Sequence, residues 1–153
     1  MSTDDTTSGA YTPPDISLLG AEHIAAYRKS DGEAGYLWNG VPTLLLTTVG
    51  RRSGEPRTSA LIFATDGDDY LVVASMGGAP SHPQWYLNVS ANPKAEIQVK
   101  AAHIRVVART ASAEEKPRLW DIVRGVWPNY DAYQARTDRD IPVVVLSPIP
   151  ADG

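Results

Sequence analysis

Six short runs rich in apolar and β-branched residues recur along the chain, and their spacing constrains the fold more than any other feature. The runs cover residues 42–49, 57–66, 70–75, 95–101, 103–110 and 142–147. Turns join most neighbouring runs, and the sequence Asp66-Gly67-Asp68-Asp69 favours a hairpin because Asp and Gly tolerate positive φ. The run 95–101 alternates apolar and polar residues, as a strand with one buried face does. We therefore expect antiparallel strands.

Three stretches show helical patterns, and they do not alternate regularly with the strand runs. We expect short helices within residues 16–27, 81–92 and 112–127. Ser112 and Glu115 fit a capping box at the start of the third helix, and Pro117 is expected to loosen its first turn. The absence of regular βαβ units favours an α+β, mainly β, fold in which six antiparallel strands close into a small barrel with short helices at its flanks.

Composition narrows the domain organisation and the class of partner. Residues 1–15 are rich in Ser, Thr, Asp, Gly and Pro and are expected to form a disordered tail, whereas residues 16–153 are expected to form a single domain. The chain shows neither a secretory signal nor an apolar segment of membrane-spanning length, so we expect a cytoplasmic protein without a transmembrane segment. The net charge of −4 argues against a nucleic-acid partner, which needs a basic face.

Three arginines fall within seven residues of this acidic chain, at Arg51, Arg52 and Arg57. The segment GRRSGEPR combines them with glycines that leave backbone N–H groups approachable, a combination that suits a small anion such as phosphate. It is neither a Walker loop nor a GxGxxG dinucleotide loop, because the glycine spacing differs from both. The alternative interpretation is a solvated hairpin tip.

The sequence offers no constellation for catalysis by side chains alone. The three histidines lie on different elements without carboxylates at metal-ligand spacing, no serine stands in a nucleophile elbow, and the chain has no cysteine. We therefore expect no metal site, and a bound cofactor that carries the reaction of a small-molecule substrate. Tyr130 and Tyr133 lie in a Pro/Asn/Asp-rich segment, which we interpret as a pocket lid, whereas Tyr86 is interpreted as a packing residue and His82 as a capping or surface residue.

Three longer segments resemble a known family. They are TTVGRRSGEPRTSAL (47–61), VVASMGGAPSHPQWYLNVSANP (72–93) and WPNYDAYQARTDRDIPVVVL (127–146), and in order and spacing they are similar to the deazaflavin-dependent nitroreductase family of actinobacteria. The resemblance implies a six-stranded antiparallel split β-barrel of the FMN-binding-like type. It also implies an F420H(2)-dependent oxidoreductase that transfers a hydride from the reduced deazaflavin, coenzyme F420, to electron-poor acceptors such as unsaturated lactones, coumarins, quinones and nitro compounds.

The resemblance also implies roles for individual residues. The implied cofactor-binding residues are Arg51, Arg52, Ser53 and Arg57 for the phosphate and acidic tail, the backbone of Ala74, Ser75 and Met76 for the polar edge of the ring, and Gln84, Trp85 and Asn88 beside it. The implied substrate-facing residues are Trp127, Tyr130 and Tyr133, with Tyr130, Tyr133 and Ser75 as catalytic candidates. The chain departs from the family pattern at Arg52 and Met76, where lysine is common, and at Ala60, where proline is common.

Two alternatives to this function stay open from the sequence. The first is an FMN-dependent oxidase or reductase that resembles the pyridoxamine-phosphate oxidase group, with FMN as the cofactor. The second is a protein that binds the deazaflavin as a carrier or sensor without turning it over.

Overall fold

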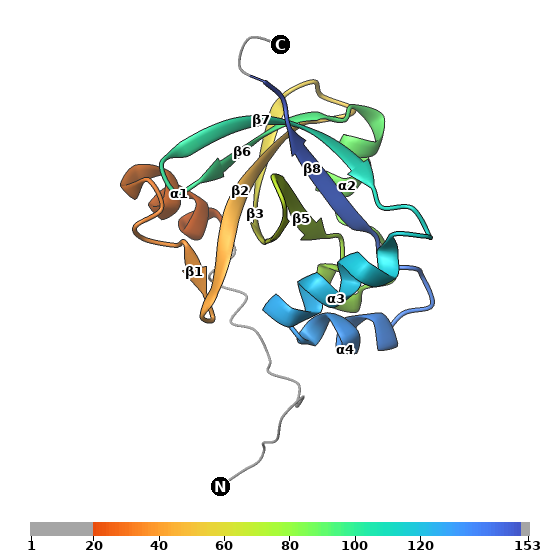
Figure 1. The fold of residues 1–153 in the computed structure, drawn as a ribbon. Helices are drawn as coiled ribbons and strands as arrows, with labels where there is room; N and C mark the ends of the chain where they lie inside the picture. The colour runs from red at the N-terminus through yellow and green to blue at the C-terminus, as the bar shows by residue number, and fades with distance from the viewer. Residues whose placement is uncertain (1–19, 151–153) are drawn as a thin grey trace, which may run out of the picture.

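A curled antiparallel sheet forms the centre of the molecule in the computed structural model, which describes residues 20–150 (Figure 1). The strands are β1 (Leu37–Trp38), β2 (Val41–Val49), β3 (Pro56–Ile62), β4 (Ala64–Asp66), β5 (Asp69–Val73), β6 (Lys94–Val99), β7 (Ala102–Thr110) and β8 (Val143–Pro148). The helices are α1 (Ala21–Ser30), α2 (Gln84–Ala91), α3 (Lys116–Val126) and α4 (Asn129–Ala135), with a 3₁₀ turn η3 (Met76–Gly78). The strand order is β1-β2-β6-β7-β8-β5-β4, with β3 paired to β2.

The long strand β2 shows how alternation divides the interior. Leu44 and Leu46 point into a cluster with residues of β5, β6, β7 and β8, whereas Leu45 between them packs against Tyr27 of α1. This is the period-two pattern of a strand buried on both faces. Helix α1 therefore covers one face of β2, and residues of strands β5, β6, β7 and β8 of the curled sheet cover the other.

The expected α+β class and antiparallel sheet are confirmed, but the expected strand count of six is wrong, because the described residues contain eight strands. The run 57–66 divides at Phe63: β3 pairs with β2, and β4 pairs with β5. A further two-residue strand, β1, pairs with β2 across Asn39 and Gly40, whose φ values of 49° and 82° form a tight turn. Strand pairing changes at Phe63, so one apolar run forms two strands, β3 beside β2 and β4 beside β5.

The helices differ from expectation in three places. Helix α1 starts at Ala21, and the expected segment before residue 20 and the expected tail 1–15 lie outside the described residues. Pro117 lies in the first turn of α3, where a missing N–H is not needed, so it opens the helix rather than loosening it. The capping-box bonds do form just before α3: the Ser112 N–H donates to the Glu115 carboxylate at 2.9 Å, and the Glu115 N–H donates to Ser112 Oγ at 3.2 Å.

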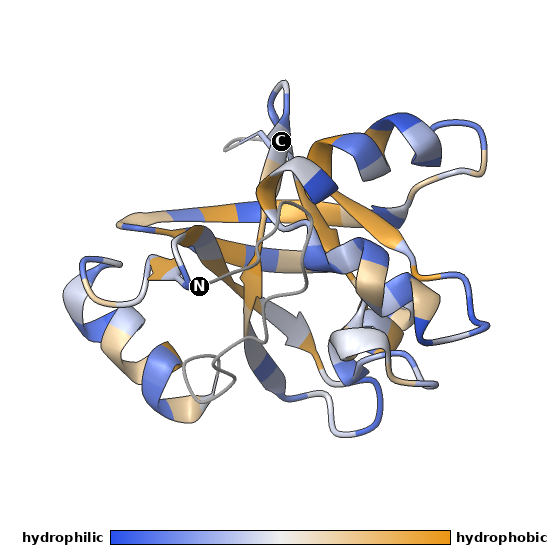
Figure 2. Cartoon of the chain, turned by 90° about the horizontal axis from the view of Figure 1, so that it is seen from below, coloured by the Kyte–Doolittle hydropathy of each residue, from blue (hydrophilic) through white to orange (hydrophobic). Residues whose placement is uncertain are grey.

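The third difference is helix α4, which was not predicted from the sequence. It begins directly after Pro128 and lies beside α3 against the β5 and β8 side of the sheet (Figure 1). Figure 2 shows that apolar residues concentrate on the strands, while the helices present mixed faces. Within residues 20–150 the structure contains no helix with the length and apolarity needed to span a membrane.

Candidate functional site

Two cavities meet on one side of the sheet and share the residues Ser59 and Trp85. We call the first the arginine pocket; it measures about 310 Å³ and is lined by residues that include Gly50, Arg51, Arg52, Ser53, Arg57 and Gln84. We call the second the apolar cavity; it measures about 330 Å³ and is lined by residues that include Trp38, Ile62, Met76, Trp127, Tyr130 and Tyr133. The molecule therefore offers one continuous recess with a basic end and an aromatic end.

The loop between β2 and β3 forms the floor of the arginine pocket. The Gly50 N–H donates to the Glu55 carbonyl at 2.8 Å, and the Gly54 N–H donates to the Gly50 carbonyl at 2.8 Å, so the loop is closed on itself. A Cβ atom at position 50 would lie 2.7 Å from Ser53 Oγ, which explains why glycine stands there. Gly54 has a φ of +75°, a conformation that side chains other than glycine rarely adopt.

Arg51 is held in place by helix α2. Its guanidinium donates to Gln84 Oε1 at 2.9 Å and to Asn88 Oδ1 at 2.9 Å. Asn88 is buried, accepts a further bond from the Arg51 N–H and donates to Thr48 Oγ1 at 3.1 Å. Arg51 therefore ties the loop to α2 and to β2, so its charge is fixed in position before any ligand binds.

Arg52 and Arg57 differ from Arg51 because neither side chain makes a hydrogen bond or an ion pair within residues 20–150. Both side chains are exposed at the rim of the pocket, and the nearby Glu55 forms no ion pair with them in that part of the chain. Two guanidinium groups without acidic partners give the pocket a positive field. Such a field attracts an anion that can accept charge-assisted hydrogen bonds.

Aromatic side chains from β1, from α4 and from Trp127 at the end of α3 build the inner wall of the apolar cavity. The rings of Trp38 and Trp127 lie 5.3 Å apart between centroids, and those of Tyr130 and Tyr133 lie 6.1 Å apart in an edge-to-face arrangement. Trp127 Nε1 donates to the Tyr133 hydroxyl at 3.2 Å. These rings belong to the apolar core, so the cavity wall is part of the packed interior.

The hydroxyl group of Tyr130 stands out within this wall. Its side chain is only 4% exposed, and the hydroxyl makes no hydrogen bond with any residue in the described part of the chain. Burial first, and Tyr133 second, raise the pKa of Tyr130, so the hydroxyl stays protonated at all ordinary pH values. A buried donor without a partner is costly unless it serves a ligand.

Backbone groups at the end of β5 form the outer wall of the apolar cavity. The turn Met76-Gly77-Gly78 has φ values of 47°, 65° and 86°, so three successive residues are left-handed. Within residues 20–150, no acceptor pairs with the N–H groups of Ser75, Met76 and Gly77, and the Ser75 hydroxyl is likewise unpaired although Ser75 is 8% exposed. Unpaired donors along an apolar wall suit the oxygen atoms of a planar ligand.

The structure brings together nearly all the residues expected from the sequence. The arginine pocket holds Arg51, Arg52, Ser53, Arg57, Gln84, Trp85 and Asn88, and the apolar cavity holds Ser75, Met76, Trp85, Trp127, Tyr130 and Tyr133. Ala74 is the exception, because it is fully buried and lines neither cavity. Its N–H donates to the Pro142 carbonyl at 3.0 Å, and its carbonyl accepts from Arg139 at 3.1 Å.

The interpretation of Tyr130 and Tyr133 as part of an irregular lid was wrong. Both lie on α4 at 4% and 5% exposure, and both pack into the core with Val143 and Val145. The spacing of three residues places the two rings on one face of the helix. Only seven residues long, α4 offers too little periodicity for a helical pattern to be recognised in the sequence.

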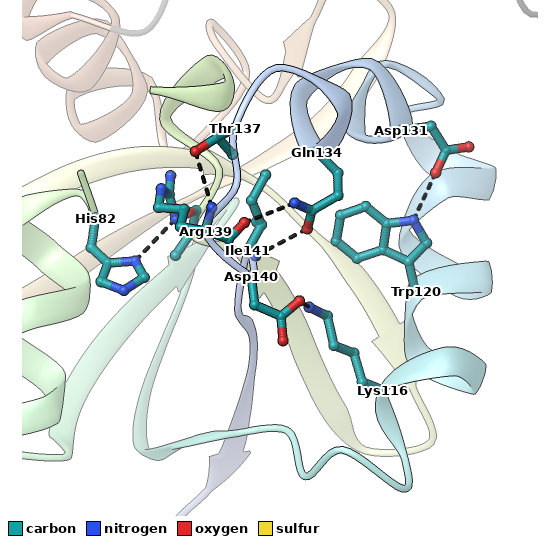
Figure 3. A network of polar contacts seen from close by, with 10 residues as sticks. His82, Lys116, Trp120, Asp131, Gln134, Thr137, Arg139, Asp140 and Ile141 are labelled. Atoms are coloured by element: carbon teal, nitrogen blue, oxygen red, sulfur yellow. Dashed lines mark hydrogen bonds and ion pairs between the residues drawn. The ribbon is translucent and has the colours of Figure 1, made fainter. Parts of the chain in front are cut away.

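Sequence reasoning missed two contributors, Trp38 and Arg139. Trp38 lines the apolar cavity from the short strand β1, and no motif marks it. Arg139 donates to His82 Nδ1 at 3.0 Å (Figure 3). Burial, and then the charge of Arg139, lower the pKa of His82, so this histidine is neutral and accepts a bond instead of capping α2, whose N-cap is Pro83. In residues 20–150 no group of three His, Cys, Asp or Glu side chains lies close enough together to hold a metal ion.

Comparison with known proteins gives the family. The sequence profile of the F420H(2)-dependent quinone reductase family matches residues 20–148. The chain belongs to this family. It is 46% identical over 129 residues to an F420H(2)-dependent quinone reductase of Mycobacterium tuberculosis, an alignment that covers 82% of this chain and 87% of the relative.

Solved structures agree with the family assignment. An F420-H2 dependent reductase shares 38% identity and a TM-score of 0.65 over 69% of this chain and 94% of its own. The haem storage protein HutZ of Vibrio cholerae, at 17% identity and a TM-score of 0.56, covers 86% of this chain and 91% of its own and shares the fold alone. The predicted family, the class of oxidoreductase and the dependence on coenzyme F420 are therefore confirmed.

Proposed function

We propose that this protein transfers a hydride from reduced coenzyme F420 to electron-poor small molecules, with quinones as the principal class and with unsaturated lactones, coumarins and nitro compounds as further acceptors. One observation carries the proposal: the basic arginine pocket and the aromatic apolar cavity meet at Ser59 and Trp85. A ligand with an anionic tail and a planar ring needs these two environments side by side. Family membership supplies the identity of that ligand.

The phosphate and the acidic tail bind in the arginine pocket. Arg52 and Arg57 bring unpaired guanidinium groups, Arg51 brings a fixed charge, and the Ser53 hydroxyl lies in the same loop. Charge-assisted hydrogen bonds from these groups account for most of the affinity. The arginine at position 52 preserves the positive charge that lysine commonly provides in the family.

The apolar cavity would hold the ring, with the N–H groups of Ser75, Met76 and Gly77 as donors to its oxygen atoms. Trp85 lines both cavities. When bound, the reduced deazaflavin supplies the hydride. The residues of this chain supply orientation, and they exclude water from the reacting atoms.

The acceptor lies against the aromatic wall formed by Trp127, Tyr130 and Tyr133. The Tyr130 hydroxyl is protonated and unpaired, so it donates to the acceptor oxygen that gains negative charge during the reaction. The Tyr133 hydroxyl accepts from Trp127 and lies on the same wall. Ser75, on the opposite wall, supplies a third hydroxyl.

Titration of the purified protein with coenzyme F420 and with FMN, followed by ligand fluorescence, tests the cofactor. We expect tighter binding of F420, and tighter binding of FMN would assign the protein to the FMN-dependent alternative. The second arm supplies reduced F420 together with a quinone, a coumarin or a nitroaromatic compound. We expect turnover, fastest with the quinone. Tight F420 binding without turnover of any acceptor would indicate the carrier or sensor instead.

A further inference from the structure

Arg139 lies just after helix α4 and reaches back to the turn that follows β5, more than fifty residues earlier in the chain. Its guanidinium makes four hydrogen bonds there: to the carbonyl of Ala79 at 2.8 Å, to that of Ala74 at 3.1 Å, to that of Ser75 at 2.7 Å and to His82 Nδ1 at 3.0 Å. One side chain therefore holds both ends of the segment 74–82. The four bonds use all three nitrogen atoms of the planar guanidinium group, which lysine lacks.

The segment that carries Arg139 is itself anchored (Figure 3). Gln134 donates to the Arg139 carbonyl at 2.8 Å and accepts from the Ile141 N–H at 3.0 Å. The next residue, Asp140, pairs with Lys116 of α3 at 2.8 Å. Arg139 thus connects the turn after β5 to a segment that is itself bonded to α3 and α4.

The bonds to Ala74 and Ser75 have a direct geometric consequence. In a trans peptide the C=O and the following N–H point in opposite directions, and the described chain has no cis peptide. When Arg139 binds the Ala74 and Ser75 carbonyls, it turns the N–H groups of Ser75 and Met76 away from itself. They belong to the three successive N–H groups of this turn, Ser75 to Gly77, for which no acceptor lies within residues 20–150.

The charge of Arg139 adds to the effect of geometry. Arg139 forms no ion pair in the described part of the chain, because the neighbouring Asp140 is bound to Lys116. Within the described part of the chain, the Arg139 guanidinium donates to three carbonyl oxygens and to one neutral imidazole. A guanidinium bound to a carbonyl polarises that peptide and strengthens the N–H at its other end as a donor.

Two further contacts join the same two elements. Arg136 donates to the Gly77 carbonyl at 3.2 Å. A Cβ atom at Gly78 would lie 2.6 Å from the Tyr133 carbonyl oxygen, so the turn after β5 sits directly on the backbone of α4. The wall that faces the ring and the wall that faces the acceptor are therefore in main-chain contact.

We propose that Arg139 is a positioning residue for the cofactor ring: by binding the Ala74 and Ser75 carbonyls it aims and polarises the Ser75 and Met76 N–H groups toward the apolar cavity. The inference rests on the proposed function, because it takes the deazaflavin ring as the partner of those N–H groups. Arg139 acts through the backbone and does not touch the ring. Its effect is confined to the ring end of the ligand, whereas the phosphate end depends on Arg52 and Arg57.

The experiment compares Arg139→Met and Arg139→Lys with wild type, with Arg118→Met as the matched control. Arg118→Met also removes an arginine, but it breaks an exposed ion pair with Asp66, and neither residue lines the apolar cavity. Each protein is titrated with oxidised coenzyme F420 and, separately, with inorganic phosphate. We expect Arg139→Met to weaken F420 binding about tenfold, as loss of hydrogen bonds of this kind would, while phosphate affinity stays unchanged. Arg139→Lys is expected to recover little, because an ammonium group cannot bridge the carbonyls.

The second readout needs no cofactor. Amide proton shifts of Ser75 and Met76 in the free protein should move upfield in both Arg139 variants and stay unchanged in Arg118→Met. Wild-type affinity for F420 in Arg139→Met, an equal loss of phosphate affinity, or unchanged amide shifts would each overturn the inference. A wild-type protein that does not bind F420 would instead overturn the proposed function, and the amide shifts would still decide whether Arg139 aims these groups.

Discussion

The two ends of the recess are built in opposite ways. The arginine pocket comes mainly from one segment of eight residues, Gly50 to Arg57, backed by α2, and the side chains of Arg52 and Arg57 are exposed and unpaired within residues 20–150. The apolar cavity draws on strands β1, β3 and β5, on helix α4 and on Trp127, which follows the end of α3, and its aromatic side chains belong to the core. The arginine pocket is formed by neighbouring residues of the sequence, whereas the apolar cavity is formed by core residues that only the tertiary fold brings together.

This contrast teaches where binding and stability can be separated. An exposed arginine contributes little to folding, so its loss is felt by the ligand alone. A buried tyrosine at the acceptor wall contributes to both, so its loss mixes a defect of folding with a defect of activity. Substitutions at Tyr133, Arg52, Arg57 and Tyr130 test whether effects on ligand binding or activity can be separated from effects on folding stability.

The largest effect is expected from Tyr133→Ala, which removes a core ring. Truncation of a buried aromatic residue costs roughly 3–5 kcal/mol of unfolding free energy. Tyr133→Phe is the matched control, since it keeps the ring and loses the bond from Trp127, about 1 kcal/mol. Equilibrium unfolding in urea measures both. A Tyr133→Ala protein as stable as wild type would favour the pocket lid that the sequence indicated.

The next effect belongs to the arginine pocket. Arg52→Ala and Arg57→Ala are each expected to weaken F420 binding by about 1.5–3 kcal/mol, because each removes a charge-assisted hydrogen bond. Their unfolding free energies should stay within about 0.5 kcal/mol of wild type. Raising the salt concentration should weaken the wild type more than either variant. Equal affinity of all three proteins at low salt would make the arginine cluster a solvated turn.

A smaller effect is expected from Tyr130→Phe, which splits the two roles of one residue. The ring stays in the core, and a buried hydroxyl without a partner in the described chain is removed, so stability should hold or rise slightly. Turnover with acceptors whose oxygen gains charge should fall about tenfold in kcat, while F420 affinity is unchanged. Steady-state kinetics with a quinone provide the measurement. An unchanged kcat would leave the buried hydroxyl without a role.

The smallest effect is a dependence on pH that passes through His82. Its pKa is lowered in the folded protein, so the unfolded chain binds the proton more readily, and stability falls as the pH drops below the ordinary value of 6.5. Protonation would also place a second cation against Arg139. His82→Asn keeps an acceptor near the position of Nδ1 and does not titrate. Melting temperatures between pH 5 and 8 should therefore fall less toward acid in His82→Asn than in wild type; parallel curves would contradict this.

The cluster of residues in the arginine pocket could be predicted from the sequence, but much of the apolar cavity could not. The sequence GRRSGEPR predicts a basic, glycine-containing turn, and its residues line the arginine pocket, whereas its binding of an anion stays a prediction. The alternation of the β-runs predicts an antiparallel sheet, which is confirmed. The break at Phe63 is invisible in the sequence, because only pairing with two different neighbours divides the run 57–66. Family resemblance placed Tyr130 and Tyr133 at the acceptor side but gave no sign of α4.

Arg139 shows why the remainder was out of reach. Its partners lie more than fifty residues away and are mostly backbone carbonyls, which carry no sequence signature. From the sequence alone, Arg139 was one more charge in a polar stretch. Only the tertiary fold reveals that it is tied to the turn after β5.

The close approach of Gly78 to Tyr133 has a consequence for anyone who wishes to redesign this protein. Because main-chain atoms meet there without a side chain between them, the gap between the two walls is set by the backbone. Under the proposed function, the chemical preference of the acceptor wall is set separately, by side chains such as Trp127 and Tyr130. A directed-evolution library at those two positions can therefore explore new acceptors at constant geometry. Gly78 is the position that such a library must leave untouched.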